Sequence, residues 1–346
     1  MPRAPLLTVT DSGLFCEAGN FYIDPWEPVS RAVVTHAHSD HARLGAQAYL
    51  AAEGNERLLA TRLGDLAPID ILRYGERLDV NGVTVSFHPA GHILGSAQVR
   101  VEHGGEVWVV SGDYKIEPDP TCPGFEPVKC DTFITEATFG LPIYRWADPS
   151  DVFAQINRWW RANQERGKAS MLFCYALGKA QRILAGIDPS IGPIYTHGAV
   201  ENLTRDYRAS GVELPPTAVA SEMPRRTKFS DALILAPPSA NGTPWLRRFG
   251  SIATGFASGW MAVRGMRRRK AIDRGFVLSD HADWTGLLAA VEESGAERVL
   301  VTHGYVAQMA RFLQERGVEA LALSTRFDDQ MEEAVESSAL PTEDME

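Results

Sequence analysis

Over about the first 145 residues, hydrophobic and polar positions alternate in short runs, which is typical of β-strands. Residues 84–87 alternate after the Asn81-Gly82 pair, and residues 98–103 alternate before Gly104-Gly105. Asn-Gly and Gly-Gly pairs favour the tight turns of β-hairpins. This part of the chain is therefore predicted to be mostly β.

The pattern changes near Ala147, where apolar residues begin to recur at helical spacing. Asp148 or Ser150 can cap this helix. Its apolar positions are Val152, Phe153, Ile156, Trp159 and Trp160. Strand-like and helix-like segments alternate beyond it, which favours an α/β layer. The predicted strands are 171–175, 194–196, 233–236, 275–278, 298–301 and 321–323, and the predicted helices are 179–185, 200–208, 284–293 and 306–316.

Composition narrows the class of protein. The chain has 346 residues, of which 45% are hydrophobic, so disorder and fibrous repeats are excluded. No apolar run approaches the roughly 20 residues of a membrane span, and the first residues lack the apolar stretch of a signal peptide. Four cysteines without a CxxC pair fit a reducing compartment. We expect a cytoplasmic protein with no membrane partner.

The net charge of −10 is unevenly distributed. Residues 326–346 hold eight acids against one arginine, whereas residues 264–274 are strongly basic. The basic cluster consists of Arg264, Arg267, Arg268, Arg269, Lys270 and Arg274, with Asp273 as its one acid. Such a cluster can bind phosphates or can simply form a solvated face, and the sequence leaves both interpretations open.

The strongest chemical signal follows the strand-like residues 32–34. Four side chains of the types that bind metals lie within six residues: His36, His38, Asp40 and His41. In an extended segment His36 and His38 point the same way, and Asp40 and His41 are expected in the turn into a following helix. One loop can therefore serve two metal ions.

Further ligands are available where later strands end. His92 lies in a turn flanked by Gly91 and Gly95, and Asp113 follows the apolar residues 107–110. A carboxylate at such a position can bridge two cations. In order and spacing, His36-x-His38-x-Asp40-His41, His92 and Asp113 resemble the metallo-β-lactamase fold, which implies an αββα sandwich with a metal site at one edge. Asp24 resembles the early aspartate of that fold, which orients a histidine ligand; a simple Asp-Pro turn is the alternative.

Three later motifs resemble the β-CASP branch of this fold, a group that cuts nucleic acids and carries an inserted domain. They are residues 135–140 with Glu136, residues 279–283 with His281, and residues 301–304 with His303. The resemblance implies a first metallo-β-lactamase segment at 1–146, an inserted α/β domain at 147–265, a return at 266–326 and an acidic tail at 327–346.

Position by position, the resemblance implies two divalent metal ions. His36, His38 and His92 would hold the first, Asp40, His41 and His303 the second, and Asp113 would bridge them. Zinc suits the mixture of histidine and carboxylate, and manganese is compatible with the oxygen-rich second site. Asp40, Glu136 and His281 are the catalytic candidates, with His281, oriented by Glu136, protonating the leaving oxygen.

The turn at Gly178-Lys179 is a candidate anion site. It resembles the corresponding turn of β-CASP nucleases, where free amides and the helix dipole would favour a phosphate. An ordinary strand-to-helix turn is the alternative. The candidate substrate-binding residues are Gly178, Lys179, Arg264, Arg267, Arg268, Arg269 and Lys270.

The whole pattern resembles bacterial exonucleases associated with DNA ligases and helicases. It implies an exonuclease of single-stranded DNA ends in repair, with a ligase or helicase of the same pathway as partner. His303 matches RNA-processing members, so an RNA-processing nuclease is the first alternative. An inactive nucleic-acid-binding scaffold and a thioesterase-like hydrolase are the others. The intact ligand set argues against the scaffold, and the thioesterase would leave Glu136 and His281 without a role.

Overall fold

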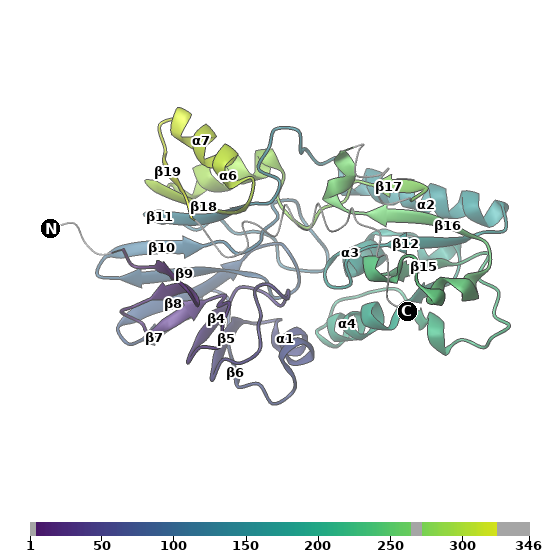
Figure 1. Ribbon diagram of the computed structural model, residues 1–346, viewed down its shortest axis with the longest axis horizontal. Helices are drawn as coiled ribbons and strands as arrows, with labels where there is room; N and C mark the ends of the chain where they lie inside the picture. The colour runs from purple at the N-terminus through teal and green to yellow at the C-terminus, as the bar shows by residue number, and fades with distance from the viewer. Residues whose placement is uncertain (1–4, 264–271, 324–346) are drawn as a thin grey trace, which may run out of the picture.

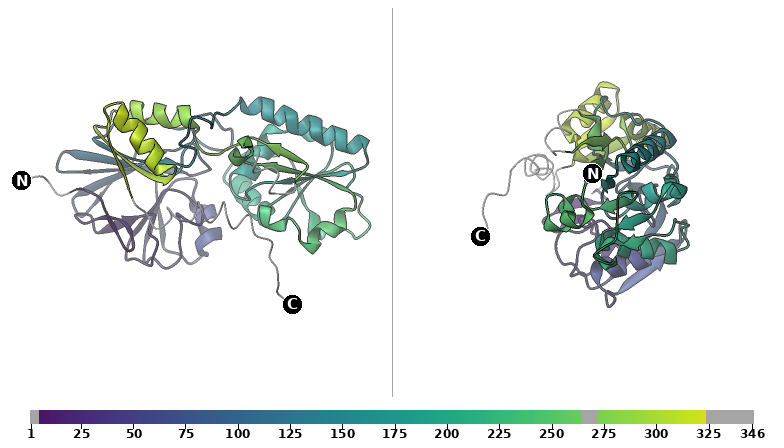
Figure 2. Two further views of the ribbon diagram at one scale, coloured as in Figure 1. Left: turned by 45° about the horizontal axis from the view of Figure 1, so that its top comes forward. Right: turned by 90° about the vertical axis from the view of Figure 1, so that its right-hand side faces the viewer.

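The computed structural model describes residues 5–263 and 272–323 of the chain. Two sheets pack face to face with helices on their outer sides, and a third sheet with its own helices lies beside them (Figures 1 and 2). This confirms the predicted αββα sandwich with an inserted α/β domain. In the described part of the chain, no helix has the length and apolar character required to cross a membrane.

The first sheet is formed by the N-terminal residues. The first two strand pairs, at its N-terminal edge, are antiparallel, and the other three are parallel. In spatial order its strands are β1 (Thr8–Thr10), β2 (Gly13–Cys16), β3 (Phe21–Ile23), β4 (Ala32–Val34), β5 (Tyr49–Ala52) and β6 (Ile69–Leu72). Helix α1 (Glu56–Leu63) covers its outer face and buries Leu58, Leu59 and Leu63 there.

The second sheet combines both halves of the chain. In spatial order it contains β19 (Glu319–Ala322), β18 (Arg298–Gly304), β11 (Thr132–Ala137), β10 (Glu106–Val110), β9 (Ala97–His103), β8 (Val83–Pro89) and β7 (Arg77–Val80). Helices α6 (Trp284–Ser294) and α7 (Val306–Glu315) cover its outer face, where Leu287 and Met309 pack against Phe133 and Val299.

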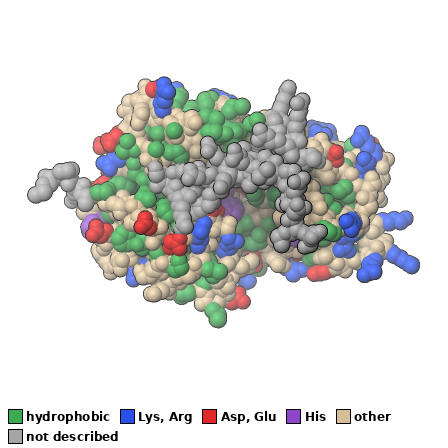
Figure 3. Space-filling model, in the orientation of Figure 1, with side chains coloured by type: hydrophobic (Ala, Val, Ile, Leu, Met, Phe, Trp, Pro, Cys, Tyr) green, Lys and Arg blue, Asp and Glu red, His purple; other side chains and the backbone are tan. Residues whose placement is uncertain are grey.

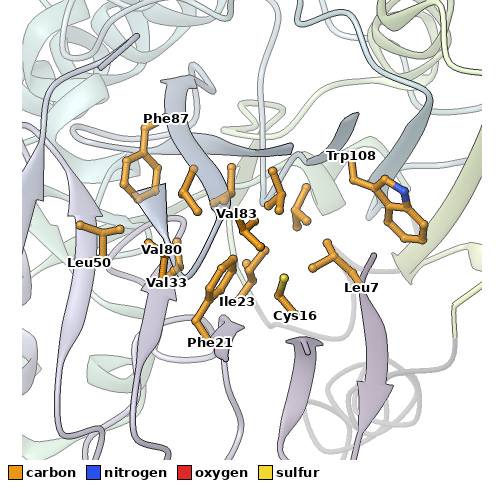
Figure 4. Close-up of a cluster of buried hydrophobic side chains, with 14 of the residues drawn as sticks. Leu7, Cys16, Phe21, Ile23, Val33, Leu50, Val80, Val83, Phe87 and Trp108 are labelled. Atoms are coloured by element: carbon orange, nitrogen blue, oxygen red, sulfur yellow. The ribbon is translucent and has the colours of Figure 1, made fainter. Parts of the chain in front are cut away.

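The core between these sheets follows from strand alternation. Val83, Val85 and Phe87 of β8 face inward because every second residue of a strand points to the same side. They meet Phe21 and Ile23 of the first sheet, and all five side chains are buried (Figure 4). The metal-binding motifs therefore project from the ends of strands that a packed core holds rigid.

The third sheet is inserted between β11 and α6 and is parallel throughout. In spatial order its strands are β14 (Ala218–Val219), β13 (Ile194–Thr196), β15 (Leu233–Ala236), β12 (Ala169–Phe173), β16 (Ile252–Ala257) and β17 (Arg274–Phe276). The helices α2 (Pro149–Glu165), α3 (Lys179–Gly186) and α4 (Gly198–Ala209) pack against one face. Short 3-10 segments are η1 (Pro189–Ile191), η2 (Ala220–Glu222), η3 (Pro238–Ala240), η4 (Pro244–Phe249) and η5 (Gly259–Ala262).

Some local predictions differ from the structure. β17 pairs with β16 of the third sheet although it lies beyond residue 266, where we placed the return of the chain, because Gly255–Ala257 offers it a free strand edge. The expected helix directly after His41 is absent: residues 40–42 form turns, and β5 follows. The acidic tail and the cluster from Arg264 to Lys270 lie outside the described residues.

Five buried charges link the insertion to the sandwich. Asp119 Oδ2 lies 3.3 Å from Lys115 Nζ and 3.2 Å from Arg182 Nε. Asp280 Oδ2 lies 2.8 Å from Lys179 Nζ, and its Oδ1 lies 3.5 Å from Arg182 Nη1. All five residues are at most 8% exposed. Since an unpaired charge in such a place is strongly destabilising, this buried ion network fixes helix α3 against the sandwich.

Removing the central cation of this network should destabilise the protein. Arg182→Ala would leave Asp119 and Asp280 facing each other without the guanidinium, and we expect a loss of about 3–5 kcal/mol in the free energy of unfolding. Urea unfolding followed by circular dichroism measures it. The matched control is Arg205→Ala on the neighbouring helix α4, where the side chain is 60% exposed and its ion pair contributes about 1 kcal/mol or less. Equal unfolding midpoints for the two variants would contradict the assigned role of the network.

Candidate metal centre

Three histidines and one aspartate converge at the edge of the sandwich. His36 Nε2 and His92 Nε2 each lie 3.0 Å from His38 Nδ1. Asp113 Oδ2 lies 3.6 Å from His36 Nε2 and 3.8 Å from His92 Nε2. The four ligand atoms all fall within 4.8 Å of one another. Nitrogen and carboxylate donors gathered in this way suit a single divalent cation.

Glycines allow the ligand-bearing turns to approach each other. Gly112 has a φ of 56°, and a Cβ there would lie 2.8 Å from Thr35 Cβ, so only glycine lets the Asp113 turn pack against the histidine loop. Gly91, with a φ of 73°, performs the same task beside His92, since a Cβ would collide with the Lys115 carbonyl. Gly91, one of the two glycines that flank His92 in the sequence, is thus required for steric reasons.

A second group of ligands adjoins the first. His41 Nε2 is buried and lies 3.5 Å from both Asp40 Oδ2 and Asp113 Oδ2, and it makes no hydrogen bond to any residue that the structure describes. The His303 ring stacks on the His41 ring with centroids 5.7 Å apart. Asp113 faces both groups, which is the position that a bridging carboxylate requires.

The electrostatic surroundings favour a cation at the second group. Burial lowers the pKa of His41, but Asp113, Asp40 and Asp24 outweigh it and raise this pKa well above its usual value. Burial holds the pKa of His36 and His92 well below the usual range, so these two rings are neutral and can act as ligands. The first group of donors therefore fits a divalent metal ion, and the carboxylates around His41 favour a further positive charge beside it.

Outer partners fix the ligand rings in orientation. Asp24 Oδ2 accepts a hydrogen bond of 2.7 Å from His41 Nδ1 and one of 2.6 Å from Thr35 Oγ1. The carbonyl oxygen of Asp280 accepts one of 2.8 Å from His92 Nδ1. The two bonds from histidine Nδ1 leave Nε2 of His41 and of His92 directed at the site, as in other histidine-metal centres. Sequence reasoning missed Thr35 and Asp280, although both directly precede a candidate histidine.

Two non-glycine residues of the site have left-handed backbone. Asp24 has a φ of 45° and His303 a φ of 55°. Such a conformation is unfavourable for a side chain with a Cβ and persists where the surroundings determine it. Asp24 is held by its bonds to Thr35 and His41. At Gly304 a Cβ would collide with the Ala137 carbonyl, so the end of β18 packs tightly against β11 and carries His303 to the site.

Glu136 and His281 form a pair beside the ligands. His281 Nδ1 lies 3.0 Å from both carboxylate oxygens of Glu136, and Glu136 Oε1 also accepts a 2.8 Å bond from the Tyr114 amide. Burial lowers the pKa of His281, but Glu136 and then Asp113 outweigh it and raise the pKa to about 9. The ring is thus protonated at neutral pH and can donate a proton. Ligand atoms of Asp113, Glu136 and His281 also lie within 4.8 Å of one another, so the pair borders the metal cluster.

A cleft of about 370 Å³ opens above these groups, between the sandwich and the insertion. His38, Asp40, His92, Asp113, His281 and His303 line one side, and Phe139, Tyr175, Trp260 and Lys179 are among the other lining residues. Tyr175 is 49% exposed, whereas Trp260 packs on Phe139 with ring centroids 4.7 Å apart. The cleft combines reactive groups with an apolar wall, as ligand sites commonly do.

The structure contradicts the expected chemistry of the Gly178-Lys179 turn. The amides of Gly178, Lys179 and Ala180 are not free, because they donate to Gln181 Oε1, Leu177 O and Tyr175 O. Lys179 is 2% exposed and pairs with Asp280. Glycine is required at 178 for packing instead: its φ is 83°, and a Cβ would collide with Ile93, the neighbour of His92. The turn positions the insertion rather than offering an open anion site.

The sequence of the chain is similar to the sequences of several named proteins. No protein-family model matches the chain. Over 328 residues, 94% of its length, it is 32% identical to a protein of Opitutus terrae named "Probable DNA ligase", and it spans 32% of that protein. It is 30% identical over 127 residues to cleavage and polyadenylation specificity factor subunit 3 of Dictyostelium discoideum, matching 36% of this chain and 16% of the relative. Endoribonuclease YSH1 of Yarrowia lipolytica is 32% identical over 124 residues, 35% of this chain and 14% of the relative.

Among solved structures, a protein of unknown function from Enterococcus faecalis V583 superimposes with a TM-score of 0.59. The match covers 86% of this chain and 79% of that one, and at 12% identity it shows the fold alone. The similarity to the Opitutus terrae protein covers 94% of this chain, whereas the similarities to the two RNA-processing proteins cover about a third of it. Together with the fold and the strand-end motifs, these relatives support the resemblance of the chain to the β-CASP branch of the metallo-β-lactamase family.

Proposed function

We propose that the protein is a metal-dependent nuclease that hydrolyses phosphodiester bonds. The observation that carries this proposal is the position of Asp113, which lines the cleft and lies next to both the histidine cluster and the Glu136–His281 pair. His36, His38 and His92 would hold one ion, Asp40, His41 and His303 a second, and Asp113 would bridge them. Zinc suits these donors best, and manganese is the alternative.

Different residues of the chain would have different roles in hydrolysis. When bound, the two ions supply an activated water and neutralise the charge that develops on the phosphate oxygens. Asp24 and the Asp280 carbonyl hold His41 and His92 in the orientation that ligation requires. Because Nδ1 of His281 is bonded to Glu136, its Nε2 is the nitrogen that donates a proton to the leaving oxygen.

We propose single-stranded DNA ends as the substrate and DNA repair in the cytoplasm as the setting. A region like this chain occurs within a protein named as a DNA ligase, and a ligase requires trimmed DNA ends. A DNA ligase or a helicase of the same pathway is the partner that this suggests. The second candidate is RNA processing, which the relatives named cleavage and polyadenylation specificity factor and endoribonuclease favour.

Parallel digestions of DNA and RNA test the substrate. With zinc or manganese added, we expect stepwise shortening of end-labelled single-stranded DNA, and no shortening by Asp113→Ala, because this variant loses the bridging carboxylate. Denaturing gels with matched DNA and RNA of the same base sequence give the result. Cleavage of RNA alone would move the assignment to RNA processing, and inactivity on both would contradict the nuclease.

Metal content tests the ligand cluster separately from activity. His92→Ala removes one of three converging nitrogens, so we expect it to lose at least one bound ion per chain, as measured by inductively coupled plasma mass spectrometry. His103→Ala is the matched control, since His103 is an exposed histidine that bonds the Gly82 carbonyl. Equal metal content in both variants would exclude His92 as a ligand.

Leaving-group dependence tests His281. Loss of a general acid typically lowers kcat by about 10²–10⁴-fold, and we expect His281→Ala to do so on DNA while it keeps its metal. A nitrophenyl phosphodiester needs no proton on its leaving oxygen, so the variant should cleave it at close to the wild-type kcat. An equal loss of kcat on both substrates, or loss of metal, would instead make His281 a ligand.

A further inference from the structure

A second hollow adjoins the metal centre on the sandwich. This groove has a volume of about 680 Å³ and is lined by Trp26, Ser39, Asp40, Arg43, Leu44 and Arg62, among others. None of these residues except Asp40 belongs to the ligand clusters or to the Glu136–His281 pair. The groove is thus a feature of the surface that the reaction itself does not explain.

The groove continues the catalytic cleft. Ser39 and Asp40 line both cavities, so the two hollows meet beside the proposed second ion. A chain molecule whose reacting bond lies at the metal centre can extend past Asp40 into the groove. A small substrate would fill the cleft and leave the groove empty.

The chemistry of the groove suits a nucleic acid strand. Arg62 is exposed on helix α1, and its Nε donates a long hydrogen bond of 3.5 Å to Ala42 O, which keeps it beside the loop that carries Asp40 and His41. Arg43 lies on that same loop. Figure 3 shows Lys and Arg side chains beside a histidine near the middle of the face that it draws. Guanidinium groups pair well with phosphate oxygens.

Apolar surface accompanies the two arginines. Leu44 is 67% exposed, and Trp26 is partly exposed at the same groove. A positive groove with an aromatic side chain is the arrangement that holds single strands without sequence preference, because backbone phosphates and base or sugar faces are both accommodated. Among the described residues that line the groove, Asp40 is the one carboxylate, and it belongs to the candidate metal centre.

We propose that this groove binds the part of a single-stranded nucleic acid that continues beyond the scissile phosphate, with Arg43 and Arg62 on its phosphates and Trp26 against a sugar or base. The proposal rests on the nuclease function and adds the path of the uncleaved strand. It places the reacting end of the strand in the 370 Å³ cleft and the remainder over helix α1.

Steady-state kinetics at several salt concentrations test the groove. For a twelve-nucleotide strand we expect Arg62→Ala to raise KM about three- to tenfold and to change kcat less than twofold, since the reacting groups stay in place. Each phosphate contact to a single strand contributes about 0.7 to the slope of log affinity against log salt, so the slope should fall by about that amount. Arg62→Glu should raise KM further.

Arg57→Ala is the matched control. Arg57 is an exposed arginine of the same helix that does not line the groove, so its KM and salt slope should equal those of the wild type. If the wild type cleaves the strand and Arg62→Ala behaves like Arg57→Ala, the groove proposal is wrong while the nuclease stands. If the wild type cleaves neither DNA nor RNA, binding of the same strand is measured instead by fluorescence anisotropy in the presence of a metal chelator. Equal salt slopes of the binding affinity for the wild type and Arg62→Ala would then overturn the groove proposal.

Discussion

The structure depends on the pairing of charges that are buried where the insertion meets the sandwich. Lys115, Asp119, Lys179, Arg182 and Asp280 are nearly inaccessible to water, and each is stable only beside its partner. Helix α3 consequently has one position relative to the sandwich. The backbone of Asp280 then holds His92 Nδ1, so the placement of the insertion and the geometry of a candidate metal ligand are set by the same residue.

The candidate metal centre shows how a rigid scaffold serves reactive side chains. Its donors come from strand ends and turns, whereas the hydrophobic core fixes the strands themselves. Asp24 and Thr35 orient the ligand rings, and the left-handed backbone at Asp24 and His303 is maintained by tight packing around the site. Such preorganisation lets the ligands bind a cation without a large rearrangement.

The cleft and the groove together form one path over the molecule. The cleft has reactive groups on one side and Tyr175 and Trp260 on the other, while the groove beyond Asp40 is lined by arginines. This division suits a polymer, because bond cleavage and strand holding are assigned to separate residues. The relatives are named as a DNA ligase and as RNA-processing proteins, and a protein distinguishes RNA from DNA through its contacts to the 2′-hydroxyl.

Sequence alone determined the fold class and the candidate metal and catalytic residues, because each motif is short and lies at or after the end of a short apolar segment. The structure brings His36, His38, His92 and Asp113 together, as the sequence predicts. The structure differs from the prediction at Lys179. The sequence indicated an accessible phosphate-binding residue, but the side chain is buried against Asp280. The buried ion network, the role of the Asp280 carbonyl and the groove at Arg62 were decided by tertiary structure only. The buried ion network joins residues as distant in sequence as Lys115, Arg182 and Asp280. Whether a charge is solvated or paired depends on which distant segments pack around it, and the local spacing of residues does not encode that packing.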